Sequence, residues 1–257
     1  IRSGYANVGG IAGTTYGIIE NCVNTGDIFI GSICTNFNTQ RQRAGGITGG
    51  CNGGDLKNCV NFGTVYAEKN NVGGIAGSMD GTSTSGSGNN NLVSCANFGN
   101  VYCGNPATTG AVLGLKGTKN VQNVYFDAQT IGVKAGENTN VDNIVGMETA
   151  DLISGQPIEG LSADIWDYQA GMYPTLKSYA DEAKAVAARK VIAKAATGEI
   201  FTELLNDVEL GENATWSLVD GTTFKIENGK LIVPKNVSEI VTDTLVAVNG
   251  ANVRRPM

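Results

Sequence analysis

The sequence predicts a mostly β protein: a parallel β-solenoid (β-helix) of Gly- and Asn-rich repeats, followed by a capping segment, a linker helix and a small β-sandwich. Two observations lead to this prediction. Short segments with alternating apolar residues recur along the first half of the 257-residue chain, and such alternation is typical of strands. The composition also changes near residue 150, because 28 of the 36 glycines and all six cysteines precede it. We therefore expect two domains.

Composition excludes several classes of function. The chain contains no His, which removes His general bases, Ser–His and Cys–His nucleophile pairs and His-containing zinc sites. Its net charge of −6 argues against a nucleic-acid partner. No apolar run approaches the ~18 residues that a membrane span needs.

Each repeat opens with a segment of the type apolar-Gly-Gly-apolar-small-Gly. This segment occurs at residues 8–13, 44–49 and 72–77, and in altered form at 110–114. A second segment of the type apolar-x-Asn-Cys-x-Asn-x-Gly-x-apolar follows it, although one copy has Ser before the Cys. These copies occupy residues 19–28, 56–65 and 92–101, and a degenerate copy occupies 121–127.

The spacing of the second segment indicates a stacked coil. Cys22, Cys59 and Cys95 are 37 and 36 residues apart, and Val124 stands in the Cys position 29 residues later. Periods of about 20–50 residues are typical of solenoids, in which each coil buries its apolar face against the next. We expect Ile to stack on Ile, Cys on Cys and Asn on Asn, with hydrogen bonds along the Asn column.

These two segments resemble the GLUG-motif repeats of bacterial surface proteins. Four copies cover roughly Asn7 to Asp127, about half of the chain. The resemblance implies a large secreted or wall-attached protein, and in some IgA-cleaving metallopeptidases such repeats lie outside the catalytic unit. The His-Glu-x-x-His helix of such a peptidase is impossible here without His. Because the first repeat begins almost at Ile1, we expect the chain to be a piece of a longer one.

Residues 147–176 follow the repeats, and residues 1–177 are assigned to the solenoid with its cap. The segment Gly171-Met172-Tyr173-Pro174-Thr175-Leu176, preceded by Trp166, resembles the segment that commonly closes arrays of these repeats. We expect Trp166, Tyr173 and Leu176 to cover the last exposed coil. The alternative is a sugar-binding platform that uses the rings of Trp166 and Tyr168.

Residues 178–198 are predicted to form a linker helix. Tyr179, Ala183, Val186, Val191 and Ala195 recur at three- and four-residue spacing, which is typical of an amphipathic helix. Acidic residues lie in its first turn and Lys in its last, as the helix dipole favours. Gly198 is a natural stop signal.

Residues 199–257 are predicted to form the β-sandwich. The candidate strands are Ala214–Leu218, Thr223–Glu227, Leu231–Val233 and Ile240–Val248, and Asn228-Gly229 between two of them predicts a hairpin. The segments 215–217, 224–231 and 244–247 resemble the atypical bacterial immunoglobulin-like domains, with Trp216 as the core tryptophan. That family ends with one further strand, which we expect to be missing or very short here.

The cysteines allow two interpretations. The column contains Cys22, Cys59 and Cys95. We favour the interpretation that these cysteines are buried and pack as small hydrophobic residues; the alternative is a disulfide or a metal site. Cys34 with Cys51 is a possible disulfide of an exported protein. No Cys-x-x-Cys occurs, so we expect no zinc.

Other residues are candidates for binding an anion or a cation. Arg41 and Arg43 could contact an anion, and Asn138, Asn140 and Asp142 have alternate spacing that could suit calcium, although a terminal Glu is missing. The glycine runs lack the Gly-Lys-Ser/Thr ending of a phosphate loop. Glycoside hydrolysis would need paired carboxylates. The repeats offer only six acids, several of them on turns: Glu20, Asp27, Asp55, Glu68, Asp80 and Asp127.

The sequence therefore predicts a non-enzymatic, extracellular or cell-surface bacterial segment that acts in adhesion, ligand binding or spacing. The binding candidates are Trp166, Tyr168, Arg41 and Arg43. The expected partner is a glycan or a host or cell-surface protein, together with the rest of a longer chain, and no cofactor, metal or catalytic residue is expected. The main alternative is an accessory region of a large secreted polysaccharide-degrading enzyme or peptidase; a carbohydrate-active β-helix enzyme is the second.

Overall fold

The computed structural model divides into two compact units, Ile1–Ile192 and Ala193–Met257. It describes residues 1–3, 7–30, 43–67, 71–79, 89–103, 108–117, 120–128, 143–189, 208–209, 215–218, 221, 224–232, 244–248 and 252–256. The chain is mostly β and contains parallel stacked sheets, so the predicted fold class is confirmed at that level. Each unit is described by itself.

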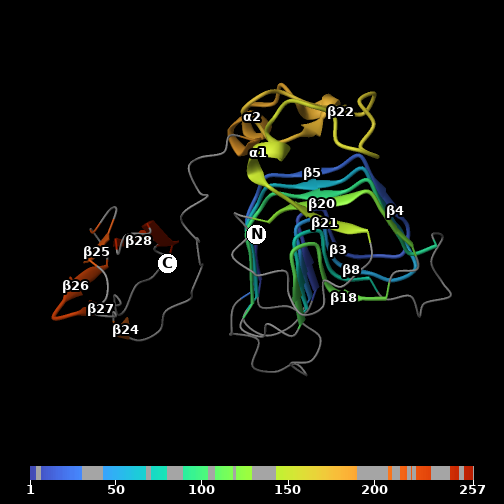
Figure 1. The fold of residues 1–257 in the computed structure, drawn as a ribbon. Coiled ribbons are helices and arrows are strands. Elements are labelled where there is room, and N and C mark those ends of the chain that lie inside the picture. Colours follow the sequence, from blue (N-terminus) through green and yellow to red (C-terminus); the bar gives the residue numbers. More distant parts are fainter. Residues whose placement is uncertain are drawn as a thin grey trace. The chain divides into compact units, whose positions relative to one another are not determined.

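The first unit is a solenoid whose coils contain up to five short strands each (Figure 1). The first coil consists of β2 (Asn7–Gly9), β3 (Ala12–Thr15), β4 (Ile18–Glu20), β5 (Val23–Asn24) and β6 (Ile28–Ile30). The second consists of β7 (Arg43–Gly45), β8 (Thr48–Cys51), β9 (Asp55–Lys57), β10 (Val60–Asn61) and β11 (Val65–Ala67). The third consists of β12 (Val72–Gly73), β13 (Ala76–Met79), β14 (Asn91–Val93), β15 (Ala96–Asn97) and β16 (Val101–Cys103).

The fourth coil is shorter, and single strands flank the array at both ends. The fourth coil consists of β17 (Thr109–Gly110), β18 (Leu113–Lys116), β19 (Asn120–Gln122) and β20 (Val124–Asp127). Before the first coil, β1 (Arg2–Ser3) pairs with β6, and after the fourth, β21 (Ile144–Met147) pairs with β20.

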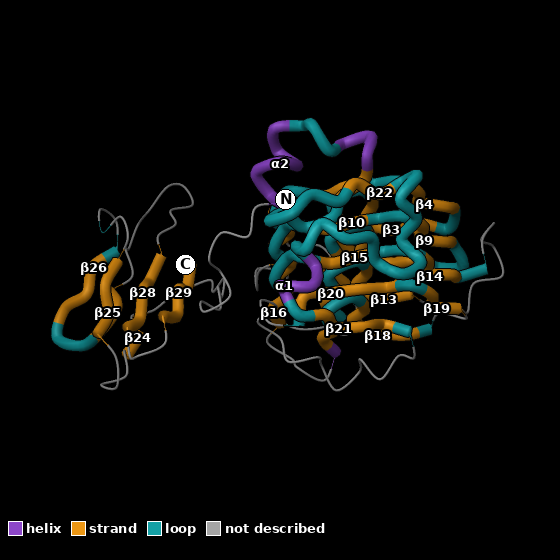
Figure 2. Tube along the Cα trace, turned by 45° about the horizontal axis from the view of Figure 1, so that its top comes forward, coloured by secondary structure: helices purple, strands orange, loops and turns teal. Residues whose placement is uncertain are grey.

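Equivalent strands of successive coils pair in parallel to form five sheets. We name them sheet A (β1-β6-β11-β16), sheet B (β2-β7-β12-β17), sheet C (β3-β8-β13-β18), sheet D (β4-β9-β14-β19) and sheet E (β5-β10-β15-β20-β21). Figure 2 shows the strands of sheet D side by side. In sheet E, Val23, Val60, Ala96 and Tyr125 are in register. The stacking predicted from the cysteine spacing is therefore confirmed.

Residues with a left-handed backbone conformation (positive φ) form one corner of each coil. Asn21, Asn58, Ser94 and Asn123 precede the Cys column and have φ of 54°, 48°, 52° and 54°. Asn adopts this conformation more readily than most residues that have a side chain. The Asn that precedes each Cys in the motif, replaced by Ser94 in the third coil, therefore turns the chain from sheet D into sheet E.

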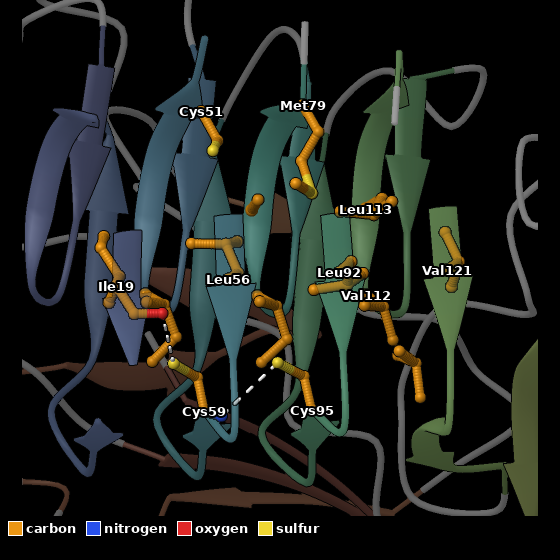
Figure 3. Packing of buried hydrophobic residues seen from close by; sticks show 14 of the residues in the cluster. Ile19, Cys51, Leu56, Cys59, Met79, Leu92, Cys95, Val112, Leu113 and Val121 are labelled. Carbon is orange, nitrogen blue, oxygen red and sulfur yellow. Dashed lines mark hydrogen bonds between the residues drawn. The ribbon is translucent and has the colours of Figure 1, made fainter. Parts of the chain in front are cut away.

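Two apolar clusters fill the interior. The larger one, shown in part in Figure 3, contains fully buried side chains of successive coils, such as Ile47 and Ile75, Leu56 and Leu92, and Cys59 and Cys95. The smaller one lies at sheets A and B and includes Ile28, Val65 and Val101. Like residues stack on like, so adding a coil buries the face of its neighbour.

The segment after the solenoid contains α1 (Thr149–Leu152), β22 (Trp166–Asp167), β23 (Thr175–Leu176), a 3₁₀ turn (Lys177–Tyr179) and α2 (Ala183–Arg189). Its apolar residues pack with Val60, Ala96 and Tyr125, which belong to three successive strands of sheet E. Figure 1 shows this segment above β5 and β20. It covers the outer face of a sheet, whereas we predicted a cover over the last coil.

The predicted helix of residues 178–198 is shorter in the described part of the chain. The turn Lys177–Tyr179 comes first, and α2 follows after Glu182, whose carbonyl accepts the Val186 amide at 2.8 Å. The Arg189 carbonyl accepts the Tyr173 amide at 3.0 Å, so the end of α2 is tied to the segment beneath it. Residues 190–198 lie outside the described residues.

The described residues of the second unit form two antiparallel three-stranded sheets. They are formed by β24 (Val208–Glu209), β27 (Lys230–Ile232) and β26 (Lys225–Glu227), and by β25 (Thr215–Leu218), β28 (Thr244–Val248) and β29 (Asn252–Pro256). Asn228 and Gly229 have φ of 49° and 75° in the β26–β27 turn, as the predicted hairpin requires. We expected a strand after β28 to be missing or very short. This expectation is wrong, because β29 pairs with β28 over five residues.

Neither α-helix in the described part of the chain has the length and apolar character of a membrane-spanning helix.

Candidate functional site

The cysteine column is built for packing. Cys59 and Cys95 are fully buried, and Cys22 is partly exposed at the first coil. The thiol of Cys59 donates to the Lys57 carbonyl at 3.1 Å. The backbone amide of Cys59 donates to Sγ of Cys95 at 3.4 Å (Figure 3). The neighbouring thiol of Cys59 and burial raise the pKa of Cys22 far above its ordinary value. All three thiols are free. The raised pKa keeps the Cys22 thiol protonated, and a protonated thiol is a poor nucleophile and metal ligand.

Cys51 is also a free and fully buried thiol. Burial raises its pKa to about 11. The disulfide considered between Cys34 and Cys51 is therefore absent at Cys51, while Cys34 itself lies outside the described residues.

Asp55 bonds one coil to the next. Its Oδ1 accepts the backbone amides of Asn89 and Asn91 at 2.8 and 2.9 Å, and Lys57 lies 3.5 Å from its Oδ2. Burial opposes the charged form, but the two amides and Lys57 outweigh burial and lower the pKa of Asp55. Asp55 therefore has a structural role as a fixed acceptor.

Asp127 joins the fourth coil to the segment above sheet E. Its carboxylate is fully buried and accepts the Thr149 hydroxyl at 2.8 and 3.0 Å and the Tyr173 hydroxyl. Two hydroxyl donors partly offset the cost of burying the carboxylate. The second buried acid of the repeats is thus also a structural acceptor.

Arg189 forms a second polar tie, between α2 and β22. The side chain of Arg189 is fully buried and its Nη2 lies 2.7 Å from Oδ2 of Asp167. Its Nε donates to the Tyr173 carbonyl at 2.8 Å. Removing Asp167 would leave the fully buried Arg189 charge without its carboxylate partner, so we assign this pair to the stability of the segment.

The two residues predicted to bind a sugar, Trp166 and Tyr168, differ in their exposure to solvent. Trp166 is 0% exposed and belongs to the cluster on the outer face of sheet E, so its ring is not open to a sugar. Its Nε1 has no hydrogen-bond partner among the described residues. Tyr168 is partly exposed, and its hydroxyl donates to the Leu161 carbonyl at 2.7 Å. Burial raises the pKa of Tyr168.

Of the two residues predicted to contact an anion, only Arg43 lies in the described residues. Arg43 is partly buried in β7, and its Nη1 donates to Oδ1 of Asn52 at 3.5 Å. Arg41 lies outside the described residues, as do the calcium candidates Asn138, Asn140 and Asp142. Within the described part of the chain, no group of His, Cys, Asp or Glu is arranged to hold a metal ion.

An aromatic pair on sheet A was missed by the sequence reasoning. Phe29 and Tyr66 are in register on β6 and β11, and their rings stack with centroids 4.8 Å apart. Both are partly exposed, while the flanking Ile28 and Ile30 are buried. The signal was an aromatic residue between two apolar or small residues after each Cys segment, as in Val65-Tyr66-Ala67.

A scan against protein-family models finds no match to the chain, and searches of curated proteins and of solved structures find none either.

Proposed function

We propose that the chain is a non-enzymatic segment of an exported bacterial surface protein, with GLUG-like repeats that bind a glycan and space other parts of the protein from the cell. The proposal rests on the resemblance of the repeat segments and on one structural observation. That observation is the stacked, partly exposed pair Phe29 and Tyr66 on the outer face of a regular sheet. Aromatic rings offer an apolar body and, in Tyr, a hydroxyl, a combination that suits the surface of a sugar.

The acids support a non-catalytic role. Asp55 accepts two backbone amides, and Asp127 accepts two hydroxyls. A retaining or inverting glycosidase needs two carboxyl groups that face the same bond. These two buried acids are instead bonded to the fold.

The second unit fits the same proposal as an immunoglobulin-like module. Its two three-stranded antiparallel sheets and the partly buried Trp216 on β25 support this assignment. Such modules carry binding surfaces on loops between strands. We assign the module a role as a spacer in the protein.

A glycan array tests the proposal with the purified chain, the variant Tyr66→Ala and a control, Tyr16→Ala. Tyr16 is 50% exposed and lies between β3 and β4, away from sheet A. We expect the parent chain to bind a defined glycan saturably and to leave the glycan chemically unchanged after incubation. Tyr66→Ala should bind at least about tenfold more weakly, whereas Tyr16→Ala should bind like the parent. Depolymerised glycan would overturn the non-enzymatic assignment. Silence across the array, or equal loss in both variants, would overturn the glycan site on sheet A.

A further inference from the structure

The buried asparagines form a hydrogen-bonded column that has a direction. Nδ2 of Asn24 donates to Oδ1 of Asn61 at 2.7 Å, and Nδ2 of Asn61 donates to Oδ1 of Asn97 at 2.8 Å. Each Oδ1 also accepts the amide of the Gly two residues later. Donors therefore point along the chain from the first coil toward the fourth.

The column ends within the solenoid on the side of the fourth coil. Nδ2 of Asn97 donates to the Ala111 carbonyl at 2.8 Å, and the next residue in register with Asn97 is Phe126. The edge of β20 is paired with β21. At the end of the column near the fourth coil, no side-chain oxygen of an asparagine is therefore available to accept a further hydrogen bond among the described residues.

The column is open on the side of the first coil. Within the described part of the chain, Oδ1 of Asn24 accepts only the Gly26 amide, whereas Oδ1 of Asn61 accepts a second bond from the preceding coil. By the order of the column, the group that completes Asn24 is a carboxamide donor from one coil earlier.

The apolar columns are open on the same side. Ile11 is 47% exposed, although its equivalents Ile47, Ile75 and Val112 are fully buried. The backbone continues the pattern, because the Ile11 amide donates to the Ile47 carbonyl and the Ile47 amide donates to the Ile75 carbonyl. The Ile11 carbonyl is therefore the acceptor for an equivalent amide of an earlier coil.

One strand of such an earlier coil is already in place. β1 pairs with β6 in parallel, with Arg2 opposite Phe29 and Ser3 opposite Ile30. The Phe29 amide donates to the Ile1 carbonyl at 2.9 Å, and the amino group of Ile1 donates to the Asp27 carbonyl at 2.7 Å. β1 thus occupies the sheet A position of a further coil.

We propose that the open face formed by β2, β3, β4 and β5 docks one more coil of the same polypeptide, which runs parallel to the others and ends in β1. This coil places an Asn in register above Asn24 and an apolar residue above Ile11. A second copy of the chain does not fit the column, because two first coils facing each other would both offer the Asn24 acceptor. The inference concerns assembly and holds whichever ligand the solenoid binds.

The test adds the missing coil. A copy of residues 43–64 is fused directly before Ile1 of the full chain, so that its last residue takes the place of Thr64 before Val65. The matched control has Asn61→Asp within the copy only, which keeps the shape and removes the donor. Amide hydrogen exchange is followed strand by strand in the parent chain and in both fusions.

We expect the fusion to slow exchange in β2, β3, β4 and β5 by about tenfold or more, and the Asp control to restore most of the parent rate. Unchanged exchange in β10 and β15 shows that the remaining coils are folded. No added protection in β2–β5, or equal protection by the Asp control, would overturn the proposal. So would protection of β2–β5 in the parent chain that rises with protein concentration, because this result would identify a second copy as the occupant.

Discussion

The second glycine of a Gly-Gly pair and the buried asparagine of the same coil lie so close together that each restricts the other. A Cβ placed on Gly46 would lie 2.2 Å from Cγ of Asn61, and one placed on Gly74 would lie 2.1 Å from Cγ of Asn97. In the fourth coil, Ala111 takes the Gly position and Phe126 stands where the Asn would be. The second Gly of each Gly-Gly pair is therefore required where an Asn of the same coil occupies its space.

Substituting Gly74→Ala tests this dependence. We expect a loss of about 3 kcal/mol in stability, because the methyl group displaces a buried amide that makes several hydrogen bonds. Calorimetry of the purified variant would show this as a lower melting temperature. Gly26→Ala is the control, since its nearest neighbour would be 3.7 Å away, and we expect it to change stability by under about 0.5 kcal/mol.

A double variant separates a clash from a general intolerance of side chains. Gly74→Ala combined with Asn97→Ala should cost clearly less than the two single losses added together, because the second change removes the atoms that the first one meets. Strict additivity of the two losses would contradict the proposed dependence.

Asp55 gives the solenoid a dependence on pH. Its pKa in the folded chain is lowered, so its bonds to the Asn89 and Asn91 amides stabilise the fold above the unfolded pKa of about 3.9. This stability is lost as pH falls through the folded pKa. We expect Asp55→Asn to melt several degrees below the parent at pH 7, with a smaller difference at pH 3. A difference that is equal at both pH values, measured by circular dichroism, would contradict this assignment.

Among the elements in the described part of the chain, sheet E has an outer face that a following segment covers. Val60 and Ala96, the outward residues of β10 and β15, pack against Trp166, Tyr173 and other residues of the segment that follows the solenoid. Phe98 stacks on Tyr173 with ring centroids 4.6 Å apart. The cover is thus anchored by apolar area and by the Asp127 bonds.

Tyr173→Phe tests the anchor. The ring and its stacking on Phe98 are kept, but the donor to the buried Asp127 carboxylate is lost. We expect a loss of about 2–3 kcal/mol and faster proteolysis between residues 149 and 189. Tyr168→Phe is the control, because its hydroxyl donates to a neutral carbonyl in a partly exposed position, and we expect a loss of about 1 kcal/mol or less.

The repeat elements could be predicted from the sequence, and the position of the cover could not. The spacing of Cys22, Cys59 and Cys95 determines the coil length, and in-register stacking follows from it. Trp166 and Tyr173 are recognisable as core residues, but their pattern does not say which face they meet. The outward Val60 and Ala96 were the available signal, because an apolar outer face predicts a partner.

The aromatic pair on sheet A was not predicted from the sequence, for a physical reason. Trp166 attracted attention as a large aromatic residue, yet a tryptophan is as useful for filling a core as for stacking on a sugar. Phe29 and Tyr66 become a pair only when β6 and β11 are in register. Such a surface depends on stacking between coils and is invisible within a single repeat.

For the first unit as a whole, the open first coil predicts a gradient of stability. Repeat arrays are held by contacts between neighbours, and β2 to β5 have a neighbouring strand on one side, whereas β7 to β10 have neighbours on both. We expect amide exchange to be fastest in the first coil and slowest in the second and third. Uniform exchange throughout the four coils would contradict this expectation and indicate a single cooperative unit.

The hydrogen bonds between coils have a mechanical consequence, because they run along the stacking axis. A tensile force applied along that axis would load each bond lengthwise, and the coils would peel apart one after another. Neighbouring coils are separated by about 4.8 Å at rest, while a repeat of 36 or 37 residues spans about 120 Å when fully extended. Under load, the solenoid would therefore lengthen in large steps, one for each coil, and dissipate energy at each step.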